Sequence, residues 1–215
     1  VAYYEDEGRV ATQTFTGINA SAPPSRFPDR ILRSGVNQFD ILPASSYLDI
    51  IKHDGQDIVK MMAIGQKLLV FKHDDLFIID CSGEFEFLDS VQHGHGIINA
   101  TAVCETPKGI FWINAKGLYY YDAQNPPVNL SIERISDPEW KKIWNIYSHI
   151  AFNPEDQHVL IFTRYEGNPD NTPDANHLLF FDVLQEAFYY KSLPSTTPYG
   201  RCNGAVLVNN KLYIS

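Results

Sequence analysis

Two histidines separated by one glycine, His93-Gly-His95, form the most metal-like pattern in the chain. On a β-strand, residues two apart point to the same face, so both imidazoles could reach one metal ion. The sequence does not indicate a third ligand, and a glycine on each side of His95 is typical of a turn. We therefore expect a polar loop here and keep His93 and His95 only as weak metal candidates.

A second group of oxygen ligands lies in Asp170-Asn-Thr-Pro-Asp174. Calcium binds such oxygens, but the segment lacks the regular acidic spacing and the terminal Glu of a calcium loop. We interpret it as a solvated connector, with Asp170 and Asp174 as weak metal candidates. No metal or other cofactor is expected.

Three aspartates each end an apolar, strand-like run: Leu76-Phe-Ile-Ile-Asp80, Leu118-Tyr-Tyr-Tyr-Asp122 and Leu178-Leu-Phe-Phe-Asp182. A glycosidase needs two carboxyl groups that face one sugar. Asp80, Asp122 and Asp182 instead occupy equivalent positions in successive units, so we predict that they stabilise turns by accepting hydrogen bonds from nearby backbone N–H groups. Nucleophile-elbow, P-loop and dinucleotide motifs do not occur, and we predict no enzymatic activity.

These aspartates belong to a repeated pattern, in which a polar turn and a basic residue precede an apolar strand. The basic residues Lys67, Lys108, His158 and Lys211 are predicted to start these strands, and they are 41, 50 and 53 positions apart. In the first three units, the Asp follows the basic residue by 13, 14 and 24 positions. The third distance is longer because additional turn-forming residues lie between the two strands. A further apolar run follows each Asp, so each unit is predicted to be a meander of about four short strands.

A single four-stranded meander cannot bury both of its faces, and its edges stay open. Packing such units around an axis buries the faces, which is the arrangement of a β-propeller. A β-sandwich also has closely spaced strands, but it would not repeat one pattern at these intervals. The predicted fold is therefore all-β: several four-stranded antiparallel blades of a β-propeller, incomplete in this chain.

The predicted organisation begins with a strand and a proline-bearing linker over residues 1–30, which belong to a preceding domain or blade. Blades follow over 31–215, and the approximate units are 31–90, 91–135, 145–195 and 200–215, the last of which starts a further blade. One inserted helix is predicted over 136–145, because Ser136 and Glu139 form a capping box and Pro138 lies in the first turn. Trp140, Ile143 and Trp144 share one apolar face of that helix.

Composition restricts the class of partner. Lys and Arg total 17 against 26 Asp and Glu, a formal charge of −9, and a surface of that sign repels phosphate, so tight nucleic-acid binding is not expected. No apolar run is long enough to span a bilayer. Cys81, Cys104 and Cys202 show no paired spacing and are predicted to be buried free thiols. Asn-x-Ser/Thr triplets begin at Asn19, Asn99 and Asn129, a pattern that arises often by chance.

The strand and turn segments resemble the propeller region of podovirus-type phage tail proteins, the nozzle or packaged-DNA stabilisation proteins below the portal. The resemblance covers roughly residues 30–190. It rests on these segments: Ile31-Leu-Arg-Ser34, Gly65-Gln-Lys-Leu-Leu-Val-Phe-Lys72, Asp75-Leu-Phe-Ile-Ile79, Gly109-Ile-Phe-Trp-Ile-Asn114, Gly117-Leu-Tyr-Tyr-Tyr-Asp122 and Ile135-Ser-Asp137.

The resemblance implies a structural subunit of the virion that is assembled in the host cytoplasm. Its partners would be further copies of itself in a ring, sixfold in symmetry, and the adjacent tail and portal-adaptor proteins; the ring would help to retain and conduct the genome. Two alternatives stay open: a carbohydrate-binding or carbohydrate-active propeller, and a cellular propeller that serves as a protein-interaction scaffold. Because the sequence begins at Val1 and ends in the apolar run Lys211-Leu-Tyr-Ile-Ser215, we also expect it to be part of a longer protein.

Overall fold

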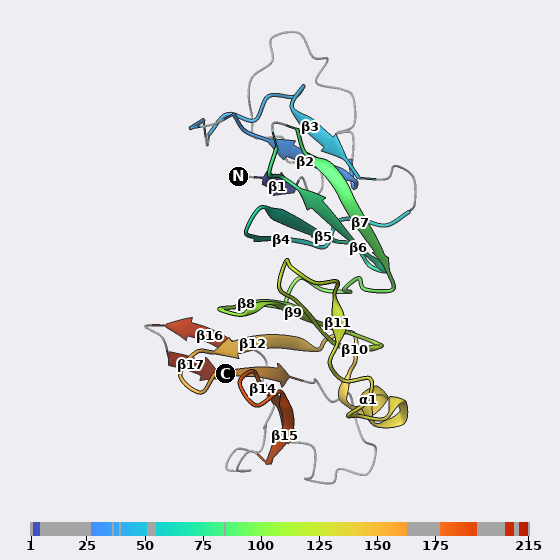
Figure 1. Ribbon diagram of the computed structural model, residues 1–215, viewed down its shortest axis with the longest axis vertical. Coiled ribbons are helices and arrows are strands. Elements are labelled where there is room, and N and C mark those ends of the chain that lie inside the picture. The colour runs from blue at the N-terminus through green and yellow to red at the C-terminus, as the bar shows by residue number, and fades with distance from the viewer. Residues whose placement is uncertain are drawn as a thin grey trace, which may run out of the picture.

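The computed structural model describes residues 2–4, 27–35, 37–38, 40–50, 55–83, 85–162, 177–192, 205–208 and 211–214. Within these ranges, short antiparallel strands dominate and one short helix is present (Figure 1). The prediction of a mostly antiparallel β protein with one inserted helix is therefore confirmed.

The strands form five sheets, which we call A to E in chain order. Sheet A contains β1 (Ala2–Tyr4), β2 (Arg30–Arg33) and β3 (Tyr47–Asp49). Sheet B contains β4 (Lys60–Ile64), β5 (Lys67–Phe71), β6 (Asp75–Asp80) and β7 (Phe87–His93). Sheet C contains β8 (Val103–Thr106), β9 (Gly109–Asn114), β10 (Gly117–Tyr121) and β11 (Val128–Asn129). Sheet D contains β12 (His149–Asn153), β13 (His158–Phe162), β14 (His177–Asp182) and β15 (Ala187–Ser192), and sheet E contains β16 (Ala205–Val208) and β17 (Lys211–Ile214).

Sheets B, C and D are four-stranded meanders, in which each strand pairs with the next along the chain. Local turn chemistry explains this order. In the first hairpin of sheet B, Ile64 pairs with Lys67, which leaves a two-residue loop. Gly65 occupies that loop with φ +57°, a left-handed conformation that two-residue hairpins require and that glycine adopts without strain.

Alternation along the strands gives sheet B two apolar faces. Leu69 and Phe71 of β5 belong to a large core shared with sheets C and D, whereas Val70 belongs to a smaller core shared with sheet A. Sheet C is also buried on both faces, because Trp112 contacts Phe71 of sheet B, and Phe111 contacts Phe181 of sheet D. The strands of a sheet that packs on both sides are apolar throughout, and all six residues of β9 are buried.

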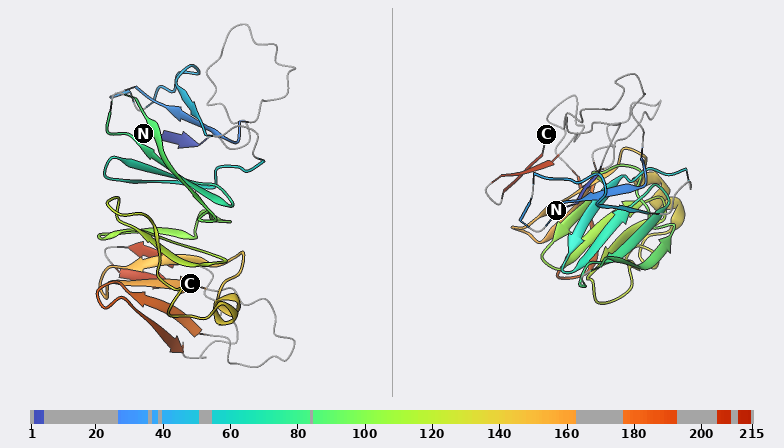
Figure 2. Two further views of the ribbon diagram at one scale, coloured as in Figure 1. Left: turned by 45° about the vertical axis from the view of Figure 1, so that its right-hand side comes forward. Right: turned by 90° about the horizontal axis from the view of Figure 1, so that it is seen from above.

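Figures 1 and 2 show sheets A, B, C and D as successive layers of one stack, and sheet E lies beside β12. The first strands of sheets C and D, β8 and β12, contact each other, and β4 of sheet B contacts β9, the second strand of sheet C. Across the described residues the stack is open, so the closed ring of a propeller stays a prediction. The predicted unit 31–90 includes β2 and β3 of sheet A, whereas sheet B alone covers residues 60–93. The division into blades also stays a prediction.

The helix α1 (Asp137–Ile143) lies at one side of the stack, near β10 and β11 (Figure 1). Trp140 is buried and its Nε1 donates a hydrogen bond of 2.9 Å to Asn114 O, while Ile143 and Trp144 pack against the large core, as the predicted apolar face requires. The predicted capping box is wrong. Ser136 Oγ bonds to the carboxylate of Glu139 (3.0 Å) and makes no side-chain bond to a backbone N–H, so the two side chains pair with each other instead of capping the helix.

Candidate functional site

The three repeated aspartates lie at or directly after the ends of strands, and each accepts hydrogen bonds from backbone N–H groups of the turn that follows. Asp80 accepts one from Ser82, Asp122 accepts two from Gln124 and Asn125, and Asp182 accepts two from Leu184 and Gln185, all at 2.8–2.9 Å. Each aspartate belongs to a different sheet. These carboxylates therefore do not form a pair around one substrate, which a glycosidase would need.

The basic residues of the repeat differ in their contacts. Lys67 pairs with Asp80 (2.6 Å), and this ammonium group lowers the pKa of Asp80 to about 2, with the bond from Ser82 adding to the effect. His158 lies 3.5 Å from Asp182 in the same register. Lys108 instead donates to Val183 O (2.6 Å) of the neighbouring sheet.

Strand register explains why Lys108 differs. β5 begins at Lys67 and β13 at His158, and each of these residues pairs with the Asp of its unit, whereas β9 begins at Gly109. Since Ile110 pairs with Tyr121, Asp122 stands opposite Gly109 and Lys108 lies just outside the sheet. The spacing of 14 in this unit, against 13 in the first, is the sequence signal of that shift.

The two histidines of the metal-like pattern point to different partners. His93 Nδ1 lies 3.1 Å from Asp75 Oδ1, and the His93 side chain is 82% exposed. His95 lies in the segment between β7 and β8, packs on Tyr119 with ring centroids 4.6 Å apart, and bonds His93 O through Nδ1 (3.0 Å). Within the described ranges, no group of three His, Cys, Asp or Glu side chains is arranged to hold a metal ion. Asp170 and Asp174 lie outside the described residues.

The cysteine prediction is wrong for Cys81, whose side chain is exposed at the end of β6 because it follows the turn residue Asp80. Cys104 is a free thiol on β8, and burial raises its pKa. Cys202 lies outside the described residues.

Asparagine side chains make several polar contacts within and between the sheets. Asn99 Nδ2 donates to Ile146 O and Ser148 O, both at 3.0 Å, and Asn129 Nδ2 donates to Lys116 O (3.0 Å). In both triplets the asparagine oxygen accepts bonds from the Ser or Thr two residues on. The side-chain amides of Asn99 and Asn129, to which a glycan would be attached, are therefore bonded to backbone carbonyl groups.

A buried ion pair joins sheet A to sheet B. Lys72 follows β5, is fully buried, and donates to Asp29 Oδ1 (2.6 Å) and Ile50 O (3.1 Å). Asn114, the last residue of β9, reaches the segment that follows sheet B, where it donates to Gly94 O and Gly96 O. The sequence interpretation missed both residues, although each stands five positions after the structural start of its strand.

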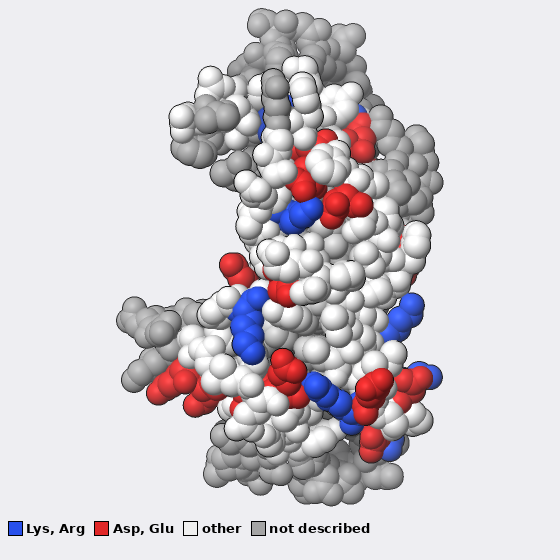
Figure 3. Space-filling view, in the orientation of Figure 1, with Lys and Arg blue, Asp and Glu red and all other residues white. Residues whose placement is uncertain are grey.

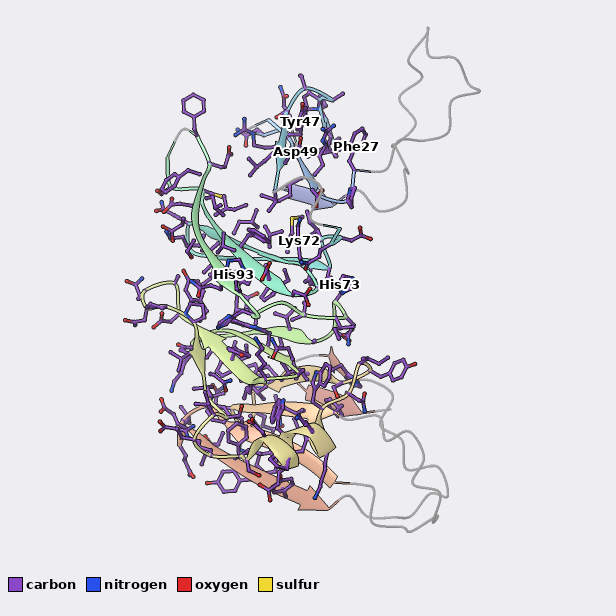
Figure 4. The ribbon with its side chains drawn as sticks, turned by 90° about the vertical axis from the view of Figure 1, so that its right-hand side faces the viewer. Phe27, Tyr47, Asp49, Lys72, His73 and His93 are labelled. Carbon is purple, nitrogen blue, oxygen red and sulfur yellow. The ribbon has the colours of Figure 1, made fainter. Side chains whose placement is uncertain are left out.

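Above Lys72, an aromatic and charged cluster covers sheet A (Figure 4). The guanidinium of Arg30 lies between the rings of Phe27 and Tyr47, 4.0 and 3.7 Å from their centroids, and makes a two-pronged bond to Asp49 (2.8 and 3.1 Å). Such stacking and pairing favour arginine over lysine. We interpret the cluster as a structural element of sheet A.

Apolar side chains stay exposed on or next to the last strand of each four-stranded sheet, and we call them the outer-edge residues. They are Phe85, Phe87 and Leu88 in sheet B, Val128 and Ile132 in sheet C, and Leu184, Tyr189 and Tyr190 in sheet D. Phe85 is the most exposed of them, at 74%. Acidic and basic groups occur elsewhere in small separate clusters on the face shown in Figure 3. Exposed apolar groups that recur at sheet edges are typical of contact surfaces.

No family model and no curated protein matches the chain. Among the described residues, no helix combines the length and the apolar character needed to cross a bilayer.

Proposed function

We propose that this chain forms blades of a β-propeller in a non-enzymatic structural subunit of a bacteriophage tail. In this proposal the subunit is part of a channel-forming ring, sixfold in symmetry, below the portal. Its partners are further copies of itself and the adjacent tail and portal-adaptor proteins, and the ring helps to retain and conduct the genome.

One observation supports the proposal most strongly: sheets B and C are each buried on both faces by other antiparallel sheets. Repeated units that pack in this way use their apolar sheet faces to hold one another together, as the units of propellers and other repeat proteins do. The outer-edge residues then remain available for neighbouring subunits.

The strand and turn segments resemble those of phage nozzle proteins, and this resemblance is the reason for proposing a tail protein. The charge of −9 agrees with that role, because an acidic channel wall repels the DNA phosphates and lets the duplex pass without adhering. A carbohydrate-active propeller is less well supported, since the repeated aspartates are bonded to turn backbone in three separate sheets.

Sizing by light scattering and negative-stain imaging of the purified chain test the proposal. The tail proposal predicts rings of several copies around a central channel, whereas a cellular scaffold predicts a monomer. A monomer at micromolar concentration, with no ring in the images, would overturn the proposal.

Phe85→Asp tests whether the outer-edge residues make the ring contacts. Phe85 is 74% exposed, so the substitution should leave the melting temperature of the isolated subunit nearly unchanged and weaken assembly at least tenfold. Ala115→Asp, in the exposed turn between β9 and β10, is the matched control and should assemble like the parent. Equal assembly of all three proteins would exclude this edge from the contact.

A further inference from the structure

Two segments that connect successive sheets are tied together in the middle of the stack. Residues 94–102 lead from sheet B to sheet C, and residues 144–148 lead from α1 to sheet D. Asn99 Nδ2 donates to Ile146 O and Ser148 O, and Ile150 N donates to Thr101 O, all at 3.0 Å. We call these three bonds the Asn99 contact. It holds the start of β12 against sheet C.

His149 is the first residue of β12 and lies inside this contact, between Ser148 and Ile150. Its ring stacks on Phe162, with centroids 4.8 Å apart and planes only 9° from parallel. Nδ1 lies 3.5 Å from Tyr147 O, and Nε2 is buried with no hydrogen-bond partner. A neutral imidazole tolerates this position, but a protonated one would place an N–H and a positive charge where nothing accepts them. Burial accordingly lowers the pKa of His149.

His95 lies in the other tied segment and is similarly enclosed. Its ring packs on Tyr119 at 4.6 Å and approaches Trp112 at 6.5 Å. Burial lowers the pKa of His95, and the positive charge of Lys116 adds to this effect, although the bond to His93 O opposes it.

The surroundings of both histidines lack a compensating carboxylate in the part of the chain that the structure describes. The titratable neighbours of His95 are Lys116, Tyr119 and His93, and Asp75 is already bonded to His93 and Gly94 N. The elements that contact β12 carry the following titratable groups: Cys104 and the exposed Glu105 on β8, His158 on β13, and Lys211 and Tyr213 on β17. His93 and His158 differ from His95 and His149 in this respect, because Asp75 lies beside His93 and Asp182 lies beside His158.

We propose that the Asn99 contact is an acid-sensitive switch, which protonation of His149 and His95 opens, so that sheet D separates from sheet C under mildly acidic conditions. To place a charged imidazole in water, His149 must leave the Phe162 ring, and the backbone on either side of it carries the bonds to Asn99 and Thr101. This inference does not rest on the proposed function.

The sign of the pH dependence follows from the two histidines. An unfolded histidine titrates near pH ~6.5, and in the folded chain the neutral form is favoured, so the unfolded state binds more protons below that pH. The stability that the two neutral histidines contribute is fully present above about pH 7. It is lost as the pH falls through ~6.5 toward the lower histidine pKa of the folded state. The pKa of Asp80, about 2, lies well below this range.

Urea unfolding between pH 7.5 and 5.0 tests the switch. For the wild-type chain the unfolding equilibrium constant should rise by up to about tenfold per pH unit for each histidine below ~6.5. His149→Phe keeps the stacked ring and removes the titration, so its pH dependence should be weaker; His93→Gln, at an exposed position with a carboxylate partner, should behave as wild type. An identical pH dependence in wild type and His149→Phe, or none in wild type, would overturn the proposal.

Hydrogen exchange of the wild-type chain gives a second readout that needs no variant. After correction for intrinsic rates, the amides of residues 145–153 should lose protection at pH 5.5 relative to pH 7.5, and those of β5 and β6 should keep it. Equal protection of 145–153 at the two pH values would also contradict the switch.

Discussion

Lys72→Met is expected to lower the free energy of unfolding by about 3–5 kcal/mol, because it leaves a buried carboxylate without its counter-ion. The Lys72 ammonium is fully buried and lies 2.6 Å from Asp29, which is itself almost completely buried. The same ammonium bonds Ile50 O, so the substitution also removes the donor that holds the end of sheet A. Chemical denaturation monitored by circular dichroism measures the loss.

Two further variants make this prediction specific. Replacing both partners, Lys72→Met with Asp29→Leu, should recover most of the lost stability, because a buried ion pair can be exchanged for apolar groups at little cost. Lys141→Met, in the exposed last turn of α1, should have no measurable effect. A single Lys72→Met variant as stable as the Lys141→Met control would show that the ion pair does not hold sheet A on sheet B.

Trp112→Ala is expected to lower stability by about 3–5 kcal/mol, since it removes the largest fully buried side chain between sheets B and C. The indole stacks on Tyr119 (5.4 Å, 9°) and meets the edge of Phe71 (5.4 Å, 65°). The midpoint of thermal or urea unfolding reports the change.

Trp112→Phe separates packing from hydrogen bonding at this site. Trp112 Nε1 is buried without a partner, so the phenylalanine variant loses some contact area but also removes an unsatisfied donor. It should therefore be much more stable than Trp112→Ala. If Trp112→Phe and Trp112→Ala were destabilised equally, the aromatic packing between sheets B and C would not contribute the stability that we assign to it.

The local elements were predictable from the sequence because strand patterning and turn chemistry are short-range. The start of β5 at Lys67 and of β13 at His158 follows from the basic residue and the apolar alternation after it. The one-residue shift at Gly109 changes which residue faces Asp122, and only the spacing of the aspartate signals it. The helix at Asp137–Ile143 was predicted from its apolar face, whereas its capping depends on side-chain rotamers that sequence spacing does not specify.

The contacts between sheets could not be predicted in the same way, because their partners lie far apart in the chain. Lys72 follows a strand, where a lysine is usually solvated, and its partner Asp29 is 43 positions away. In the sequence, Asn99 matches a glycosylation acceptor, and only the folded structure shows that its side chain bonds Ile146 O and Ser148 O. Both cases need the packing of one sheet on the next, which strand patterning alone does not give.

A double-mutant cycle between Phe71 of β5 and Trp112 of β9 tests most directly whether neighbouring sheets stabilise each other. The single variants Phe71→Leu and Trp112→Leu, each of which removes one of the two rings, and the combined variant are compared by urea unfolding. Contact between the two rings predicts a coupling free energy of about 0.5–1.5 kcal/mol. Additive losses, within about 0.3 kcal/mol, would contradict the account, because sheets B and C would then contribute to stability independently.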